Sequence, residues 1–361
     1  MALKAVHQVP DNNAAFSLSS TQFLKGVNDD DGDQVKCGYE FSPNFMVMGH
    51  RGFGMNMLQS SDPRMKSFKE NSILSFNSAA KLPIDFLEFD VQGAIVEKRV
   101  VDLTQAEFLS YGPQKQPGSV GKPLFRRTKD GKIFEWKVEN DDPLCTLQEA
   151  FEKVEHSIGF NIELKLDDQV VYTEEELTRV LQAILQVVNE YAKYRPIIFS
   201  SFQPDAALLI RKLQTTYPVF FLTNGESEIY IDIRRNSLDE AIKVCLTGGL
   251  QGIVSEVRAI FRNSGAVTRI KESKLSLVTY GQLNNVAEVV YMEHLMGVDG
   301  VIVDLVEEIT EAISGWIKPA EDGEQDSFLG EEVQMQAKTS PGFLQQQLSS
   351  LLELPPELLY A

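Results

Sequence analysis

The chain has 361 residues, of which 43% are hydrophobic and 24% are charged, and its formal net charge at pH 7 is −18. This length and composition are typical of a globular protein with one large α/β domain and short tails. The acidic balance argues against a nucleic-acid or anionic-membrane surface, since both partners need a basic patch. No apolar run is long enough to span a membrane, and the oligomeric state is left open.

Cysteine usage and the N-terminal region bear on the compartment. The three cysteines are far apart and lack metal-ligand spacing, which favours a reduced, intracellular setting. Residues 1–28 are rich in Ala, Ser and Asn and contain few acids, but they lack the arginines typical of a transit segment. We therefore expect residues 1–40 to be a flexible tail of a cytoplasmic protein, with a plastid location as the alternative.

The first predicted strand ends in a cluster of polar and glycine residues. An apolar run at 45–48 is followed by Gly49, and His50 and Arg51 come next within a glycine-rich loop. This pattern predicts a buried strand that carries both side chains at its C-terminal end. Glu70 and Asn71 then open an amphipathic segment, which predicts a helix.

Two further predicted strands carry charged residues on one face. Glu88 and Asp90 are two residues apart, and so are Glu163 and Lys165, so the period of a strand places each pair on a single face. If the three acids meet, each pair of like charges about 4 Å apart costs roughly 4 kcal/mol at an effective dielectric near 20. Lys165 offsets only one charge. Three carboxylates without a nearby thiol therefore predict a hard divalent cation, Mg²⁺ or Ca²⁺.

Short apolar strands alternate with amphipathic helices through most of the chain. Thr146, Thr173 and Ser237 are each followed three residues later by a glutamate, the capping-box pattern of a helix start. Eight strand and helix units over roughly 270 residues fit a (β/α)8 TIM-type barrel, whose working residues lie at the C-terminal ends of the strands. A doubly wound open sheet is the alternative, although the loop after residue 49 matches a dinucleotide fingerprint poorly. The predicted strands are 45–49, 84–91, 160–166, 197–202, 218–223, 252–255, 275–280 and 299–304, and the predicted helices include 174–192, 204–215, 238–247, 285–296 and 306–316.

Two regions lie outside this alternation. Residues 92–145 form a long insertion after the second strand, with little periodicity, which is typical of a lid or a specificity loop. The barrel is expected to span 41–318. Residues 319–361 read as an acidic linker and a C-terminal amphipathic helix that docks on the barrel or on a partner.

Four motifs, in this order along the chain, resemble the glycerophosphodiester phosphodiesterase family and above all its plant-type members. They are His50-Arg51, Glu70-Asn71, Glu88-Phe89-Asp90 and Ile162-Glu163-Leu164-Lys165. The resemblance implies a TIM-type barrel that hydrolyses glycerophosphodiesters, such as glycerophosphocholine, to glycerol 3-phosphate and an alcohol.

The resemblance also implies a role for each motif residue. His50 matches a catalytic acid/base and Glu70 a motif glutamate beside the site. Arg51 and Lys165 match phosphate contacts. The metal ligands match Glu88, Asp90 and Glu163. Phe202 is the aromatic residue best placed to touch the substrate, while Phe199, Phe220 and Phe221 fit the barrel core.

The chain departs from the family pattern after the second strand. Family members follow this strand with a segment ending in a His-Asp pair, which supplies a second catalytic histidine. Here Gln92 runs directly into Gly93, and no histidine occurs between His50 and His156. Because the missing segment belongs to the insertion, we expect all eight strands to remain. A positioned acid or base is worth about 10² to 10⁴ in rate, so we expect reduced metal-dependent activity.

Simpler readings of the same residues remain open. His50 could be a satisfied core histidine, Arg51 a loop arginine and Lys165 a structural ion-pair partner. His7, His156 and His294 are expected to be solvated or structural. The functional alternative is a catalytically inactive barrel that binds glycerophosphodiesters or a protein partner. An isomerase or aldolase with Lys165 as a Schiff base is a more distant possibility.

Overall fold

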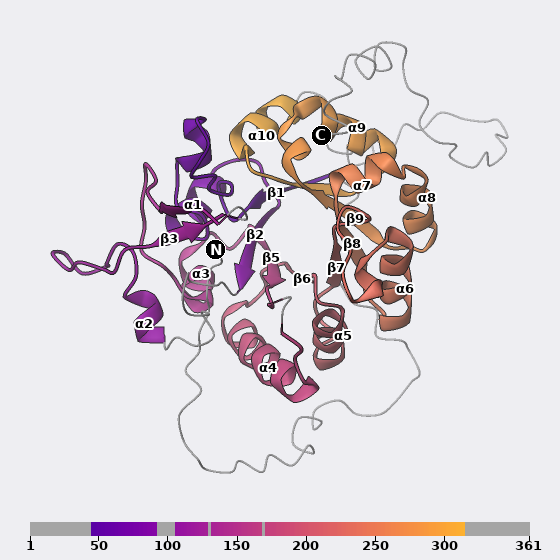
Figure 1. The fold of residues 1–361 in the computed structure, drawn as a ribbon, viewed down its shortest axis with the longest axis horizontal. Helices are drawn as coiled ribbons and strands as arrows, with labels where there is room; N and C mark the ends of the chain where they lie inside the picture. The colour runs from indigo at the N-terminus through magenta and orange to yellow at the C-terminus, as the bar shows by residue number, and fades with distance from the viewer. Residues whose placement is uncertain (1–44, 92–104, 129–130, 168–169, 315–361) are drawn as a thin grey trace, which may run out of the picture.

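A computed structural model describes residues 45–91, 105–128, 131–167 and 170–314. Eight parallel strands close into a barrel in the order β1-β10-β9-β8-β7-β6-β5-β2 (Figure 1). All eight predicted strands are present, which confirms the (β/α)8 barrel and excludes the open sheet. The strands are β1 (Met46–His50), β2 (Phe86–Val91), β5 (Gly159–Leu164), β6 (Ile197–Ser201), β7 (Val219–Thr223), β8 (Gly252–Glu256), β9 (Ser276–Tyr280) and β10 (Gly300–Val303).

Helices surround the barrel (Figure 1). Thr146 and Thr173 form complete capping boxes with Glu149 and Glu176, as the sequence predicts, and the Ser237 hydroxyl caps the amide of Glu240. The helices are α1 (Ile73–Ala79), α3 (Leu147–Lys153), α4 (Glu174–Tyr191), α5 (Pro204–Leu213), α6 (Leu238–Gly248), α7 (Val257–Arg262), α8 (Gly265–Glu272), α9 (Ala287–Met296) and α10 (Val306–Ser314), with 3-10 turns η1 (Pro63–Lys66), η3 (Ile233–Arg235) and η4 (Gln282–Asn285).

The helix expected from Glu70-Asn71 begins later than predicted. Ser72 is its N-cap, and its hydroxyl accepts a hydrogen bond from the amide of Ser75. Asn71 has a φ of 54°, in the left-handed region, so the chain turns sharply before the helix. Glu70 therefore points back toward the barrel mouth and is not part of the first helical turn.

Most barrel strands contribute their two faces to two separate cores. Leu87 and Phe89 face outward and pack in the layer between sheet and helices. Phe86, Met48 and Phe220 face inward and fill the bottom of the barrel. Since β2 alternates in and out, its inward face continues from Phe86 to two acidic residues. The apolar filling of the barrel therefore forms the floor of a polar site at the C-terminal ends of the strands.

The described part of the insertion is an ordered element packed beside the barrel mouth. It contains α2 (Gln105–Leu109) and an antiparallel pair of short strands, β3 (Phe125–Arg127) and β4 (Ile133–Glu135). Trp136 follows β4, is 5% exposed, and donates a hydrogen bond from Nε1 to Asn56 Oδ1 at 2.9 Å. This part is thus anchored to the loop after β1.

Several sequence predictions fall on residues outside the described ranges. They are the N-terminal tail 1–40, the start of the insertion, and the linker and amphipathic helix of 319–361. None of the helices that the structure describes combines the length and the apolar composition of a membrane span.

Candidate active site

Parallel register brings the predicted site residues together at one end of the barrel. His50 is the last residue of β1 and pairs in register with Glu88 of β2. Asp90, two residues further along β2, pairs with Glu163 of β5. Lys165 follows β5 by one residue. Adjacent strands therefore place these side chains in one layer, as expected at the C-terminal ends of barrel strands.

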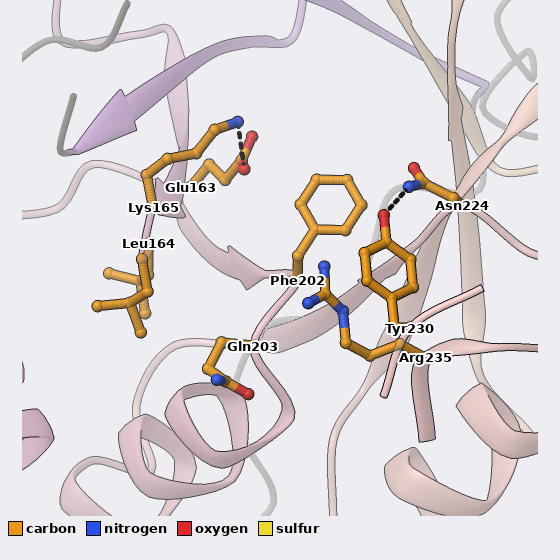
Figure 2. Close-up of a pocket in the computed structure, with 9 residues that line it drawn as sticks. Glu163, Leu164, Lys165, Phe202, Gln203, Asn224, Tyr230 and Arg235 are labelled. Carbon is orange, nitrogen blue, oxygen red and sulfur yellow. Dashed lines mark hydrogen bonds and ion pairs between the residues drawn. The ribbon is translucent and has the colours of Figure 1, made fainter. Parts of the chain in front are cut away.

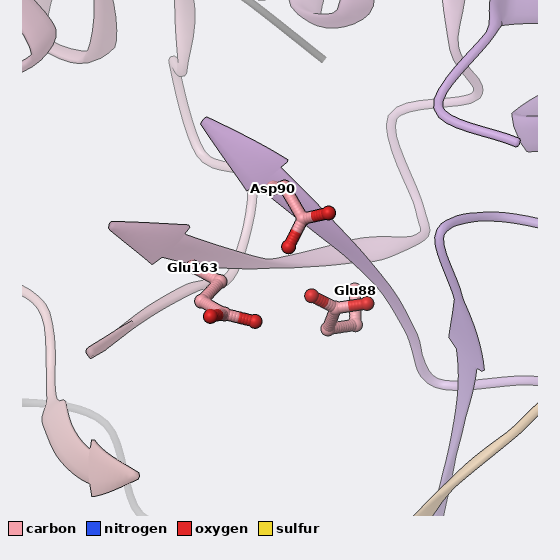
Figure 3. A group of neighbouring side chains, drawn as sticks. All are labelled: Glu88, Asp90 and Glu163. Atoms are coloured by element: carbon pink, nitrogen blue, oxygen red, sulfur yellow. The ribbon is translucent and has the colours of Figure 1, made fainter. Parts of the chain in front are cut away.

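The three acidic residues form a compact buried cluster (Figure 3). Each of Glu88, Asp90 and Glu163 offers an oxygen, and these oxygens lie within 4.8 Å of one another. Their exposed fractions are 2%, 1% and 6%, respectively. Burial raises the pKa of Glu88 to about 7, and the charges of Asp90 and Glu163 add to this while His50 opposes it. Burial likewise raises the pKa of Glu163.

Two basic side chains neutralise part of the cluster. Lys165 Nζ lies 2.6 Å from Glu163 Oε1 and 3.0 Å from Asp90 Oδ1. Arg51 Nε lies 3.2 Å from Asp90 Oδ2, a contact that the sequence does not reveal. Although burial opposes ionisation of Asp90, these two cations hold its pKa well below the ordinary value. The net negative charge of the three-carboxylate cluster is therefore smaller than the sequence suggests. The carboxylate without a direct ion pair to Lys165 or Arg51 is Glu88.

The hydrogen bonds of the Glu88 carboxylate indicate whether the cluster fits a cation. Its Oε2 accepts a hydrogen bond from the backbone amide of Arg51 at 3.0 Å. Its Oε1 is buried and has no hydrogen-bond partner among the described residues. An unsatisfied buried carboxylate oxygen is costly. Together with oxygen donors from Asp90 and Glu163, it fits a hard divalent cation.

His50 is oriented by a residue that sequence reasoning missed. Its Nδ1 lies 2.7 Å from Asp304 Oδ1, and its Nε2 accepts a hydrogen bond from Arg51 Nε at 3.3 Å. These contacts place the proton on Nδ1. Asp304 is itself held by the amide of Met55 at 2.9 Å and by Asn285 Nδ2 at 3.2 Å. Burial lowers the pKa of His50, but the carboxylates of Asp304 and Glu88 outweigh it and the net pKa is raised.

The signal for Asp304 was present in the sequence. This aspartate directly follows the apolar strand β10. The other site residues were predicted from the same kind of position, at the C-terminal end of an apolar strand. Its partner His50 lies 254 residues away, however, and only barrel closure between β1 and β10 brings them together.

Glu70 lies behind Arg51 and does not line the cavity. Its buried carboxylate accepts hydrogen bonds from Arg51 Nη1 at 2.8 Å and from the amide of Asn56 at 2.6 Å. Arg126 of β3 contributes a second ion pair, with Nη2 2.5 Å from Glu70 Oε1. Burial opposes ionisation, yet the two arginines hold the pKa of Glu70 well below its usual range. The insertion thus reaches Arg51 through Glu70.

A cavity of about 460 Å³ opens over this layer. Its walls include His50, Arg51, Lys165 and Phe202, so the predicted substrate-binding residues line one space. The Phe202 ring packs edge-on against Tyr280, with ring centroids 6.0 Å apart. Phe199 and Phe221 lie in the outer core and Phe220 in the inner one.

The other described histidines lie elsewhere. His156 contacts Arg195 beyond the C-terminus of α3. The ring of His294 packs against Phe45 at the start of β1, at a centroid distance of 5.2 Å. Of the histidines within the described ranges, only His50 lines the cavity.

The fold and the site define a (β/α)8 barrel with a buried carboxylate cluster, a histidine and two cations at its mouth, an arrangement suited to a phosphate ester and a divalent ion. Comparison with known proteins agrees. The model of the "Glycerophosphoryl diester phosphodiesterase family" matches residues 50–94 and 93–308. The chain belongs to this family, whose members are phosphoric diester hydrolases.

Two plant relatives are similar over most of their length. "Glycerophosphodiester phosphodiesterase GDPD1, chloroplastic" of Arabidopsis thaliana is 58% identical over 336 residues, covering 87% of this chain and 90% of the relative. "Glycerophosphodiester phosphodiesterase GDPD3" of the same plant is 61% identical over 320 residues, covering 83% and 85%. The crystal structure of a glycerophosphodiester phosphodiesterase from Parabacteroides distasonis shares the fold, with a TM-score of 0.53 and 17% identity over 76% of this chain and 98% of that one.

Proposed function

We propose that the chain hydrolyses glycerophosphodiesters, such as glycerophosphocholine, to glycerol 3-phosphate and an alcohol, with Mg²⁺ or Ca²⁺ bound by Glu88, Asp90 and Glu163. The observation that carries this proposal is the buried cluster of three carboxylates with an unsatisfied oxygen on Glu88, facing a cavity beside His50. When bound, the cation supplies Lewis-acid stabilisation of the phosphoryl oxygens.

Arg51 and Lys165 bind the phosphate in this proposal. Both line the cavity, and both are held by ion pairs to Asp90. Burial disfavours their charged forms, yet the neighbouring carboxylates raise the pKa of each, so both remain cations at neutral pH. Fixed positive groups of this kind stabilise negative charge that develops on a phosphoryl group. Phe202 forms the apolar wall of the same space.

His50 is the acid/base residue. Its Nδ1 proton is directed to Asp304, so its Nε2, which accepts a hydrogen bond from Arg51 Nε and lies 3.7 Å from Glu88 Oε2, is the nitrogen that can take up a proton. Asp304 fixes the tautomer and stabilises the charged ring, as a carboxylate behind a catalytic histidine does. Glu70 and Arg126 act through Arg51 and are positioning residues.

The reaction is expected to be slow because the second catalytic histidine of the family is absent. The family match breaks into two pieces that meet at residues 93 and 94, where the sequence lacks the His-Asp segment. This supports the loss of a block from the insertion. A chain with the segment restored should be faster by about 10² to 10⁴. Equal rates for the two chains would show that the second histidine is dispensable.

The proposal is tested by release of glycerol 3-phosphate from glycerophosphocholine with Mg²⁺, with Ca²⁺ and with chelator. A Glu88→Ala variant is the control. Release that requires the metal and is lost in the variant is the expected result. A folded chain that binds the diester without releasing product would instead favour the alternative of an inactive binding protein, which the missing segment supports.

A plastid location is the second part of the proposal. The sequence alone favours the cytoplasm, but the name of the relative GDPD1 places that protein in the chloroplast. Imaging of the full chain fused at its C-terminus to a fluorescent protein decides between the two compartments. A diffuse cytosolic signal would reject the plastid location.

A further inference from the structure

A second, smaller cavity adjoins the proposed active site. It measures about 170 Å³ and shares Glu163, Lys165 and Phe202 with the larger cavity, so the two spaces meet at the proposed phosphate-binding lysine (Figure 2). At about 30 Å³ per water, it has room for a small alcohol of five or six heavy atoms. A diester whose phosphate lies at Lys165 can extend one alcohol arm into it.

Beyond Phe202, the walls of this cavity come from the end of β5, from the residue before α5 and from the loop after β7. Gln203 precedes α5, Asn224 follows β7, and Tyr230 and Arg235 belong to the loop that leads to α6. Figure 2 shows the Arg235 guanidinium beside the Tyr230 ring. These residues present hydrogen-bonding groups, and neither the sequence patterns nor the family resemblance draws attention to Arg235.

Each of the two aromatic rings in this cavity is already in contact with a positively charged side chain. Arg235 Cζ lies 3.7 Å from the Tyr230 ring centroid, and Lys165 Nζ lies 5.8 Å from the Phe202 ring centroid. The Tyr230 hydroxyl donates to Glu228 Oε2 at 2.5 Å, which fixes the ring in place. A quaternary ammonium group binds to open aromatic faces. Here it would meet two positive charges.

We infer that this cavity is the subsite for the head group of the diester and that Arg235 selects a small, uncharged, hydroxyl-bearing head group, such as glycerol, over choline. The inference rests on the proposed function and refines its substrate class. Hydroxyl groups can accept from the guanidinium and exchange hydrogen bonds with the side-chain amide of Gln203. Among the described residues that line the cavity, the one carboxylate is Glu163, and it is paired with Lys165.

The experiment compares kcat/KM for glycerophosphoglycerol and glycerophosphocholine with the metal-loaded chain. We expect a preference of roughly tenfold for glycerophosphoglycerol. Arg235→Gln should bring the ratio close to one and Arg235→Lys should retain it. Arg234→Gln is the matched control, because Arg234 pairs with Asp205 and Asp232 outside the cavity and should not change the ratio.

A second variant, Gln203→Glu, tests the inference independently if Arg235→Gln does not fold. Gln203→Glu places a carboxylate in the cavity wall and should shift the preference toward choline. An equal rate on both diesters in the unmodified chain, or an unchanged ratio in the folded Arg235→Gln and Gln203→Glu variants, would overturn the inference. A uniform loss on both diesters in Arg235→Gln would also overturn it, because it would place the shared glycerol half in this cavity.

Calorimetric binding of the same two diesters separates the two proposals. If the folded chain hydrolyses neither diester, the proposed function fails. The same tenfold preference in Kd, lost in Arg235→Gln, would then still support the subsite. Equal affinities or no binding of either diester would reject it.

Discussion

The ion pair between Arg126 and Glu70 links the insertion to Arg51, the proposed phosphate-binding arginine. Arg126 Nη2 lies 2.5 Å from a carboxylate that is fully buried, and its guanidinium lies 4.3 Å from the Trp136 ring centroid. Arg126→Met keeps most of the side-chain volume and removes both interactions, together with the hydrogen bond from Arg126 Nη1 to the carbonyl oxygen of Asn56. A hydrogen bond to a charged group contributes about 1.5–3 kcal/mol, and a cation–π contact contributes about 0.5–2 kcal/mol.

We therefore expect Arg126→Met to lower the free energy of unfolding by about 2–5 kcal/mol, or Tm by roughly 4–20 °C. Glu70 would keep Arg51 as its remaining arginine partner, so the phosphate site should loosen without being lost. The expected result is a kcat/KM reduced by about tenfold, mainly through a higher KM. Thermal unfolding and steady-state kinetics measure the two effects.

Arg127→Met is the matched control, because this neighbouring arginine is exposed. It should change stability by less than about 0.5 kcal/mol. A double-mutant cycle with Glu70→Gln isolates the ion pair. If Arg126→Met is as stable and active as Arg127→Met, or if the cycle shows no coupling, the insertion does not position Arg51 and the reasoning is refuted.

Three further predictions follow from the geometry. Asp304→Asn should lower kcat by about 10- to 100-fold with little change in KM, since it removes the carboxylate charge that stabilises the protonated ring of His50; an unchanged kcat would contradict this role. Burial raises the pKa of Glu293 in α9 from 4.5 to about 8, so the folded chain retains a proton that the unfolded chain loses, and stability falls as pH rises from 4.5 to about 8. Glu293→Gln should therefore raise the free energy of unfolding by up to about 3 kcal/mol at pH 7 but not at pH 4.5, as denaturant titrations at both pH values can check. Mg²⁺ or Ca²⁺ at 100 times its Kd should add about 2.7 kcal/mol to the stability measured in chelator, and thermal unfolding should show this gain in the unmodified chain but not in Glu88→Gln.

Residues that repeat with the period of a strand were predictable from the sequence. Glu88 and Asp90 face inward because Leu87 and Phe89 must face the helices, and this alternation is local. The same reasoning placed Glu163 on the inward face of β5. Barrel closure then followed from the number and spacing of the strands, and the structure confirms it.

Contacts between distant segments were not predictable in this way. Asp304 meets His50 only because β10 closes onto β1, and Arg126 reaches Glu70 only because the insertion folds back. The sequence also overstated the negative charge of the acidic cluster for the same reason. Arg51, whose own φ is 53°, turns toward Asp90 and neutralises part of that charge. The late start of α1 depends on the left-handed turn at Asn71, which propensity alone does not reveal.

The central claim is that Glu88, Asp90 and Glu163 bind one divalent cation. Isothermal titration of the metal-free chain with Mg²⁺ and with Ca²⁺ tests it most directly. The account predicts one binding site per chain for at least one of the two ions, and loss of that site in Glu88→Gln, which preserves the shape of the side chain. Absence of binding by the folded chain, or equal affinity in the variant, would contradict the claim.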